Sequence, residues 1–118
     1  MKKILIVDDE EMNREVLSMV LQKEGYSVDE AENGAVALQM IEKEEYALIF
    51  MDINMPIMDG YETIDAIKKR LQKQINIIVL SANLDKQSIE RVLALGADNY
   101  IHKPYNLQSM LKILREYI

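Results

Sequence analysis

Residues 47–52, Ala-Leu-Ile-Phe-Met-Asp, decide the fold of this chain. Five apolar residues in succession predict a β-strand that is buried on both faces, and such strands are typical of parallel sheets. The run ends on an acid, Asp52. Residues 4–7 and residues 75–80 form two further apolar runs that also lead into polar residues. The sequence therefore predicts three central strands, each of which delivers a polar side chain to the same edge of one sheet.

Segments with a helical spacing of apolar residues separate these strands, which predicts right-handed crossovers between parallel neighbours. Two weaker runs, residues 27–31 and 99–102, are polar or short and are expected to form the edge strands. The expected helices run from Asp9 to Gly25, from Asn33-Gly34 to near Glu45, from Asp59-Gly60 through Leu71, through residues 89–95 to Gly96, and through residues 107–118.

The first of these helices has a dense set of apolar residues. Met12, Val16 and Val20 follow the helical period, and Leu17 and Met19 are expected to fill the same buried stripe. This helix is therefore predicted to pack on the sheet through all five side chains.

Three central strands and two edge strands give the order 2-1-3-4-5. The fold class is then α/β, a doubly wound five-stranded parallel sheet of the flavodoxin-like (βα)5 type. Residues 1–118 are expected to form a single domain, because no linker, repeat or low-complexity segment interrupts the pattern. In such sheets ligands bind at the carboxyl edge where the strand order reverses, here between the first and third strands.

Composition excludes several classes of function. The chain has a formal charge of -6, which argues against nucleic-acid binding because phosphate backbones select basic surfaces. It has no cysteine, so neither disulfides nor thiol chemistry are expected. No apolar run approaches the roughly 18 residues of a membrane span. We expect a soluble protein of the cytoplasm.

An acidic cluster is predicted at the switch point. Asp8 and Asp9 follow the first strand and Asp52 ends the third. Asp8 or Asp9 alone would also suit a helix cap. Asp52 does not suit one, because Pro56 and Asp59-Gly60 separate it from the next expected helix. Converging carboxylates repel one another unless a cation compensates them, and Mg²⁺ prefers oxygen ligands. One histidine, His102, and no cysteine make a zinc site improbable, and His102 is interpreted as an ordinary strand or surface residue.

Groups suited to a phosphoryl group are expected beside this cluster. A carboxylate can act as a nucleophile and form an acyl phosphate, and Asp52 is the candidate because it is central. Lys103 and Ser81 end neighbouring strands and could supply a positive charge and a hydrogen-bond donor. For each of these two residues alone, a solvated lysine or a strand-end serine is the favoured interpretation, but in combination with Asp52 it is not. Pro104 leaves the isomer of the Lys103–Pro104 bond open.

These residues together resemble the receiver domain of two-component signalling, the CheY-like response-regulator family. The resemblance spans residues from Ile4 to the last helix. It is carried by the order and spacing of Asp8-Asp9, residues 52–60 (Asp-Ile-Asn-Met-Pro-Ile-Met-Asp-Gly), Ser81-Ala82, Gly96-Ala97-Asp98 and Lys103-Pro104.

The resemblance implies a role for each matching residue. Asp52 would accept a phosphoryl group from a phosphohistidine and would bind Mg²⁺ with Asp9 and the backbone carbonyl of Asn54. Asp8 would act on the ion through water. Lys103 would pair with a phosphoryl oxygen. The remaining roles are hydrogen bonding to the phosphoryl group by Ser81 and by the Ala82 amide, a switch that couples Ser81 to Tyr100, and tuning of the phosphoryl lifetime by Asn54 and Asn83.

The resemblance also implies partners. The expected donor is a sensor histidine kinase or a histidine phosphotransfer protein, and a downstream protein is expected to bind the face formed by the fourth helix, last strand and last helix. The chain could be a stand-alone receiver or one cut from a longer regulator or hybrid kinase, and Met1 favours a stand-alone or N-terminal receiver. A monomer or a phosphorylation-linked dimer is expected, with neither nucleic acid nor membrane as partner. The residues expected on or near the output face, which could equally form solvated helix faces, are Gln87, Glu90, Arg91, Gln108, Lys112 and Arg115.

Two other functions fit parts of the pattern. A Mg²⁺-dependent phosphatase or phosphotransferase could also use an aspartate nucleophile, but enzymes of the haloacid-dehalogenase-like type space their first two acids as Asp-x-Asp, whereas Asp8 and Asp9 are adjacent. A flavin or nucleotide binder would need a phosphate loop after the first strand, where residues 8–11 are all acidic. The expected protein is therefore a signalling domain that catalyses only its own phosphorylation and slow dephosphorylation.

Overall fold

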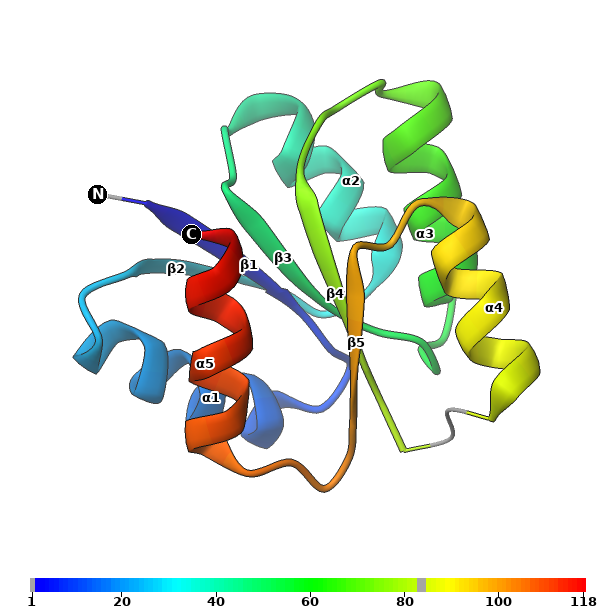
Figure 1. The fold of residues 1–118 in the computed structure, drawn as a ribbon. Helices are drawn as coiled ribbons and strands as arrows, with labels where there is room; N and C mark the ends of the chain where they lie inside the picture. The colour runs from blue at the N-terminus through cyan, green and yellow to red at the C-terminus, as the bar shows by residue number, and fades with distance from the viewer. Residues whose placement is uncertain (1, 83–84) are drawn as a thin grey trace.

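The computed structural model describes residues 2–82 and 85–118, in which a five-stranded parallel sheet lies between two layers of helices (Figure 1). The strand order is β2-β1-β3-β4-β5, as predicted, and all four pairings are parallel. The strands are β1 (Lys3–Val7), β2 (Ser27–Ala31), β3 (Leu48–Asp52), β4 (Asn76–Ser81) and β5 (Asn99–His102).

Within residues 2–82 and 85–118, five α-helices connect or follow these strands, close to the predicted positions. They are α1 (Glu11–Lys23), α2 (Gly34–Lys43), α3 (Gly60–Asp65), α4 (Lys86–Leu95) and α5 (Leu107–Tyr117). The predicted third helix is not α-helical throughout, because α3 is followed directly by the π-helical turn η1 (Ala66–Arg70). Within the described part of the chain, none of the helices combines the length and the apolar character of a membrane span.

The sheet separates two hydrophobic cores. Strand side chains point alternately to the two faces, so Leu5 and Val7 of β1 pack in one core, with α2, α3 and α4. Ile4 and Ile6 of the same strand pack in the other core, with α1 and α5. Burial on both faces explains the continuous apolar runs within β1, β3 and β4, which are residues 4–7, 48–51 and 77–80.

The expected buried stripe of α1 is wrong in part. Met12, Val16 and Met19 are 75%, 54% and 66% exposed, whereas Leu17 and Leu21 are buried. Residues 12, 16 and 19 form a second stripe at helical spacing, and each residue step turns the helix by about 100°. Only the stripe that contains Leu17 and Leu21 can face the sheet, so α1 carries an exposed apolar stripe beside its buried one.

The loop between β3 and α3 is fixed at its far end by a capping box. The Asp59 side chain accepts a hydrogen bond from the Glu62 amide at 2.9 Å, and the Glu62 side chain accepts one from the Asp59 amide at 3.3 Å. The Gly60 amide donates to the Ile53 carbonyl at 2.9 Å. The start of α3 is thereby held against the end of β3, next to Asp52.

Candidate functional site

The predicted acidic cluster forms at the carboxyl edge of the sheet. Asp8, Asp9 and Asp52 each offer a carboxylate oxygen, and these oxygens lie within 4.8 Å of one another. Asp8 is only 5% exposed, Asp9 is exposed, and the Asp52 side chain is 13% exposed. Two strands on either side of the switch point, β1 and β3, deliver these acids. The cluster is half-buried with one open side.

Lys103 reaches the cluster from the other side of β3. Its Nζ lies 3.4 Å from Asp8 Oδ2 and 4.0 Å from Asp52 Oδ2. Its backbone amide donates to the Ser81 carbonyl at 2.9 Å, which extends the β4–β5 pairing by one residue. The Lys103–Pro104 bond, whose isomer the sequence left open, is cis.

Asp52 carries a carboxyl whose ionised form is disfavoured by its surroundings. Burial raises the pKa of its carboxyl from 3.8 to about 6, opposed by the Lys103 ammonium and reinforced by the negative charges of Asp8 and Asp9. A hydrogen bond from the Ile53 amide also lowers it. Asp52 is therefore mostly ionised at neutral pH but destabilised by its surroundings. A bound cation or a covalent phosphoryl group would reduce the unfavourable free energy of this ionised carboxylate.

The donor set suits a hard divalent cation. Carboxylate oxygens are the ligands that Mg²⁺ prefers in proteins, and this ion commonly takes only one or two of them while keeping several waters. One lysine among three acids leaves a net negative charge at the cluster, and an ion of charge +2 would offset it. The residues present therefore fit Mg²⁺.

Asp8 is held by contacts that the sequence analysis did not find. Its Oδ1 accepts a hydrogen bond from the Glu10 amide at 2.9 Å. The Arg14 guanidinium donates to the Asp8 carbonyl at 2.7 Å and pairs with Glu30 of β2 at 3.3 Å. An arginine on the first turn of a helix carries no sequence signal for this role. Arg14 and Glu30 fix the backbone from which the acidic cluster projects.

The other predicted residues occupy different positions around this edge. Ser81 is 1% exposed, and the strand period places it on the face opposite to Asp52, toward α2, α3 and α4. Ala82 follows it and is exposed. Asn54 is exposed, two residues beyond Asp52. Asn83 lies outside the described residues.

Tyr100 and His102 both lie on β5. Tyr100 is 36% exposed and pairs in register with Val79. The neighbouring Ile101 is buried in the α1–α5 core, so Tyr100 projects to the other side of the sheet from Lys103 and Ile101. His102 is exposed and its Nε2 lies 3.0 Å from the Ala82 carbonyl. This position fits the interpretation of His102 as a surface residue.

Replacing the lysine tests the electrostatics of the cluster. In the Lys103→Met variant the pKa of Asp52 is expected to rise further above 6, because the ammonium 4.0 Å away favours the ionised carboxyl. The measurement is a carboxyl carbon NMR titration with a chelator present. Lys69→Met removes a lysine that pairs with Asp65 and serves as the control. An Asp52 pKa that stays the same or falls in Lys103→Met would contradict this assignment.

Comparisons with known proteins agree with this geometry. The model of the family described as "Response regulator receiver domain" matches residues 4–115. The chemotaxis protein CheY of Halobacterium salinarum is 35% identical, with 98% of this chain and 95% of that protein covered. The hybrid signal transduction histidine kinase F of Dictyostelium discoideum is 36% identical over 98% of this chain, which spans only 11% of that kinase.

Solved structures show the same likeness. The chemotaxis protein CheY4 of Vibrio cholerae has a TM-score of 0.94 at 34% identity, with 100% of this chain and 99% of that one covered. The response regulator TrrA of Thermotoga maritima, solved in complex with Mg²⁺ and BeF, has a TM-score of 0.89 at 37% identity, with 100% of both chains covered.

Proposed function

Because the chain belongs to the response-regulator receiver family of two-component signalling, we propose that it accepts a phosphoryl group on Asp52 in a Mg²⁺-dependent reaction. The donor is the phosphohistidine of a sensor histidine kinase or of a histidine phosphotransfer protein. The observation that carries the proposal is the convergence of Asp8, Asp9 and Asp52 beside Lys103. The hybrid histidine kinases among the relatives support a donor of this kind.

Asp52 is the nucleophile in this proposal. Its ionised carboxylate attacks phosphorus and becomes an acyl phosphate while the donor's imidazole leaves. With a pKa of about 6 the carboxylate is available at neutral pH. Lys103, 4.0 Å from Asp52, would stabilise charge on the phosphoryl oxygens. The Ser81 hydroxyl and the Ala82 amide would donate hydrogen bonds to those oxygens.

A magnesium ion would be held by Asp9, Asp52 and the backbone carbonyl of Asn54, with Asp8 acting through water. When bound, the ion would offset the negative charge of the carboxylates and of the incoming phosphoryl group. The carboxylate oxygens of Asp8, Asp9 and Asp52 lie within 4.8 Å of one another, which supports this arrangement.

The signal would pass from the site by a movement of Ser81 toward the phosphoryl group. Ser81 is buried on the face opposite to Asp52, and Tyr100 of the neighbouring strand is partly exposed. Movement of Ser81 would leave space that the Tyr100 ring can enter. Addition of charge at the sheet edge would thereby change the surface at β5.

The downstream partner would bind the α4, β5 and α5 face. Leu93, Tyr100 and Leu107 are 43%, 36% and 41% exposed on these elements, which offers apolar contacts. Two residues expected on this face make other contacts. Arg91 stacks on the Tyr61 ring at 3.8 Å and Arg115 pairs with Glu24 at 3.3 Å. Neither cation is fully available to a partner.

The experiment is the intact mass of the protein after incubation with acetyl phosphate, with Mg²⁺ or with a chelator. One phosphoryl group is expected with Mg²⁺ and none with the chelator. The Asp52→Asn variant should gain none, although its fold persists, because the amide is nearly isosteric. Full incorporation in that variant would contradict the assignment of Asp52. Continuous release of phosphate over many turnovers would favour the Mg²⁺-dependent phosphatase instead.

A further inference from the structure

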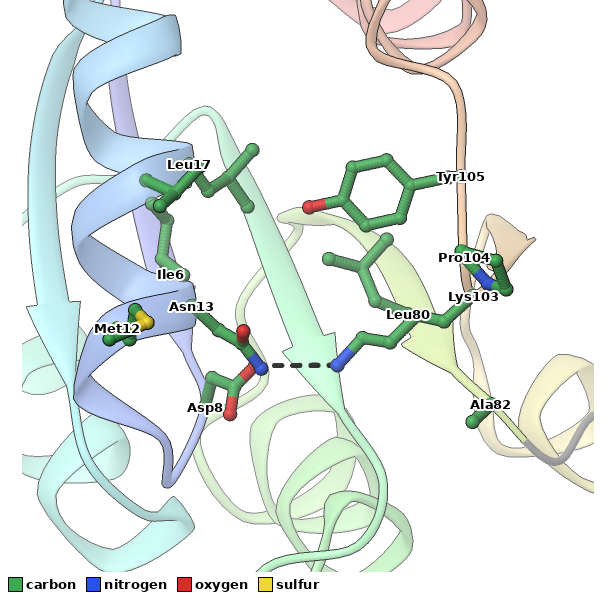
Figure 2. A pocket seen from close by; sticks show the side chains of 11 residues that line it. Ile6, Asp8, Met12, Asn13, Leu17, Leu80, Ala82, Lys103, Pro104 and Tyr105 are labelled. Atoms are coloured by element: carbon green, nitrogen blue, oxygen red, sulfur yellow. Dashed lines mark hydrogen bonds and ion pairs between the residues drawn. The ribbon is translucent and has the colours of Figure 1, made fainter.

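A cavity of about 540 Å³ opens between α1 and the segment that joins β5 to α5 (Figure 2). It lies on the face of the sheet that α1 and α5 cover. A volume of this size is typical of pockets that bind small organic groups. The cavity is lined by Ile6, Asp8, Met12, Asn13, Val16, Leu17, Leu80, Ala82, Lys103, Pro104 and Tyr105.

One end of the cavity is part of the candidate site. Asp8 and Lys103 line it, and Figure 2 shows their side chains pointing toward one another. Lys103 Nζ is 4.0 Å from the Asp52 carboxylate. A group that occupies the cavity therefore lies close to the acidic cluster.

The remaining walls are mainly apolar. Leu17 and Leu80 form buried walls, while Met12 and Val16 belong to the exposed stripe of α1. Burial of the exposed Met12 and Val16 side chains by a ligand would be favourable, since they are otherwise in contact with water.

Tyr105 adds a polar group to this apolar space. Figure 2 shows its hydroxyl directed across the cavity, and no described residue accepts or donates a hydrogen bond there. Burial raises the pKa of this phenol, so the hydroxyl stays protonated and can donate. The cavity thus presents donors, from Tyr105 and Lys103, together with apolar walls.

We propose that this cavity receives the leaving group of the phosphoryl donor and so gives the protein a preference for donors with apolar leaving groups. The inference rests on the proposed phosphorylation of Asp52. In such transfers the attacking and leaving oxygens lie roughly in line with phosphorus, so the leaving group departs away from Asp52. The cavity adjoins the same Asp8 and Lys103 side chains that border the phosphoryl position.

For an acyl phosphate the step balances without a proton. A carboxylate oxygen of Asp52 forms a bond to phosphorus, and the bond between phosphorus and the acyl oxygen breaks. The electron pair of that bond leaves with the acyl oxygen as a free carboxylate. Its apolar tail lies against Val16 and Leu17, and its charge lies near Lys103 and the Tyr105 hydroxyl.

The experiment compares acetyl phosphate with butanoyl phosphate as donors for the full chain in the presence of Mg²⁺. Acetic and butanoic acids are similarly acidic, so a rate difference reports contact with the tail rather than leaving-group reactivity. Burial of two further methylene groups predicts a butanoyl rate constant higher by about tenfold. Intact mass separates a phosphoryl adduct from acylation of a lysine.

A pair of α1 variants locates the effect. Val16→Gln replaces an apolar wall with a neutral polar side chain and is expected to reduce the ratio of butanoyl to acetyl rates severalfold. Met19→Gln makes the same kind of change on the exposed stripe but outside the cavity. It is expected to leave the ratio unchanged.

The outcomes separate this inference from the proposed function. Equal rates for both donors in the wild-type protein would overturn the leaving-group cavity while leaving phosphorylation of Asp52 intact. A ratio that falls equally in Val16→Gln and Met19→Gln would also overturn it. Failure of both donors to add a phosphoryl group would instead count against the proposed function itself.

Discussion

The Asp52→Asn variant is expected to be more stable than the wild-type protein by about 2 kcal/mol near pH 8 when divalent cations are absent. In the folded wild-type protein, burial and two neighbouring acids raise the pKa of Asp52 from 3.8 to about 6, against the opposing Lys103 charge. A difference of that size corresponds to about 3 kcal/mol, and screening by solvent at the open side reduces it. The uncharged amide removes this penalty.

The effect depends on pH in a defined direction. A raised folded-state pKa means that the native protein holds the Asp52 proton more tightly than the unfolded chain. Below about pH 4 both states are protonated and the two proteins should be nearly equal in stability. As the pH rises from 4 through 6 the wild-type protein loses stability relative to Asp52→Asn, and the difference then stays constant.

Urea unfolding at several pH values in a chelating buffer measures this difference. Added Mg²⁺ should reduce it, because an ion that binds the native acidic cluster stabilises the wild-type protein selectively. An Asp52→Asn variant that is less stable than wild type at pH 8, or a difference that does not change with pH, would show that Asp52 is not under electrostatic strain.

The Gly60→Ala variant is expected to lose about 3 kcal/mol of stability and to be phosphorylated at least tenfold more slowly. A β-carbon at residue 60 would lie 2.6 Å from the carbonyl oxygen of Asp52 and 2.8 Å from the α-carbon of Ile53. Both are backbone atoms at the end of β3, which cannot move aside as a flexible side chain can. The backbone that carries Asp52 must therefore shift.

Gly25→Ala is the matched control for Gly60→Ala. Gly25 has a φ of 95° and no atom within 4 Å of the position of an added β-carbon. Alanine there should lower stability by about 1–2 kcal/mol through backbone strain alone. It should leave phosphorylation unchanged. Normal phosphorylation of Gly60→Ala under native conditions would contradict the close approach of α3 to the acceptor strand.

Much of the fold could be predicted because continuous apolar runs identify buried parallel strands. Residues 4–7, 47–52 and 75–80 lie in or next to the three central strands, and the polar runs form the edges, so the order 2-1-3-4-5 followed. The sequence could not predict which apolar side chains of α1 are buried. Its apolar residues occupy two adjacent stripes, and a helical period alone does not say which stripe faces the sheet.

The acidic cluster was predictable for a different reason. Asp8 and Asp52 follow strands that flank the switch point, so topology brings them together whatever their side-chain conformations. Arg14 and Tyr105 were missed because their positions depend on how α1 and the β5–α5 segment pack, which no local pattern specifies. The cavity between those segments was missed for the same reason.

The separation of the two hydrophobic cores determines how the effects of two core mutations on the free energy of unfolding combine. Leu17 packs only in the core of α1 and α5, whereas Ile67 packs only in the core of α2, α3 and α4. Residues without shared neighbours contribute independently to the free energy of unfolding. Cavities made in opposite cores should therefore destabilise the protein additively, while two cavities within one core should interact, because neighbours can relax into both.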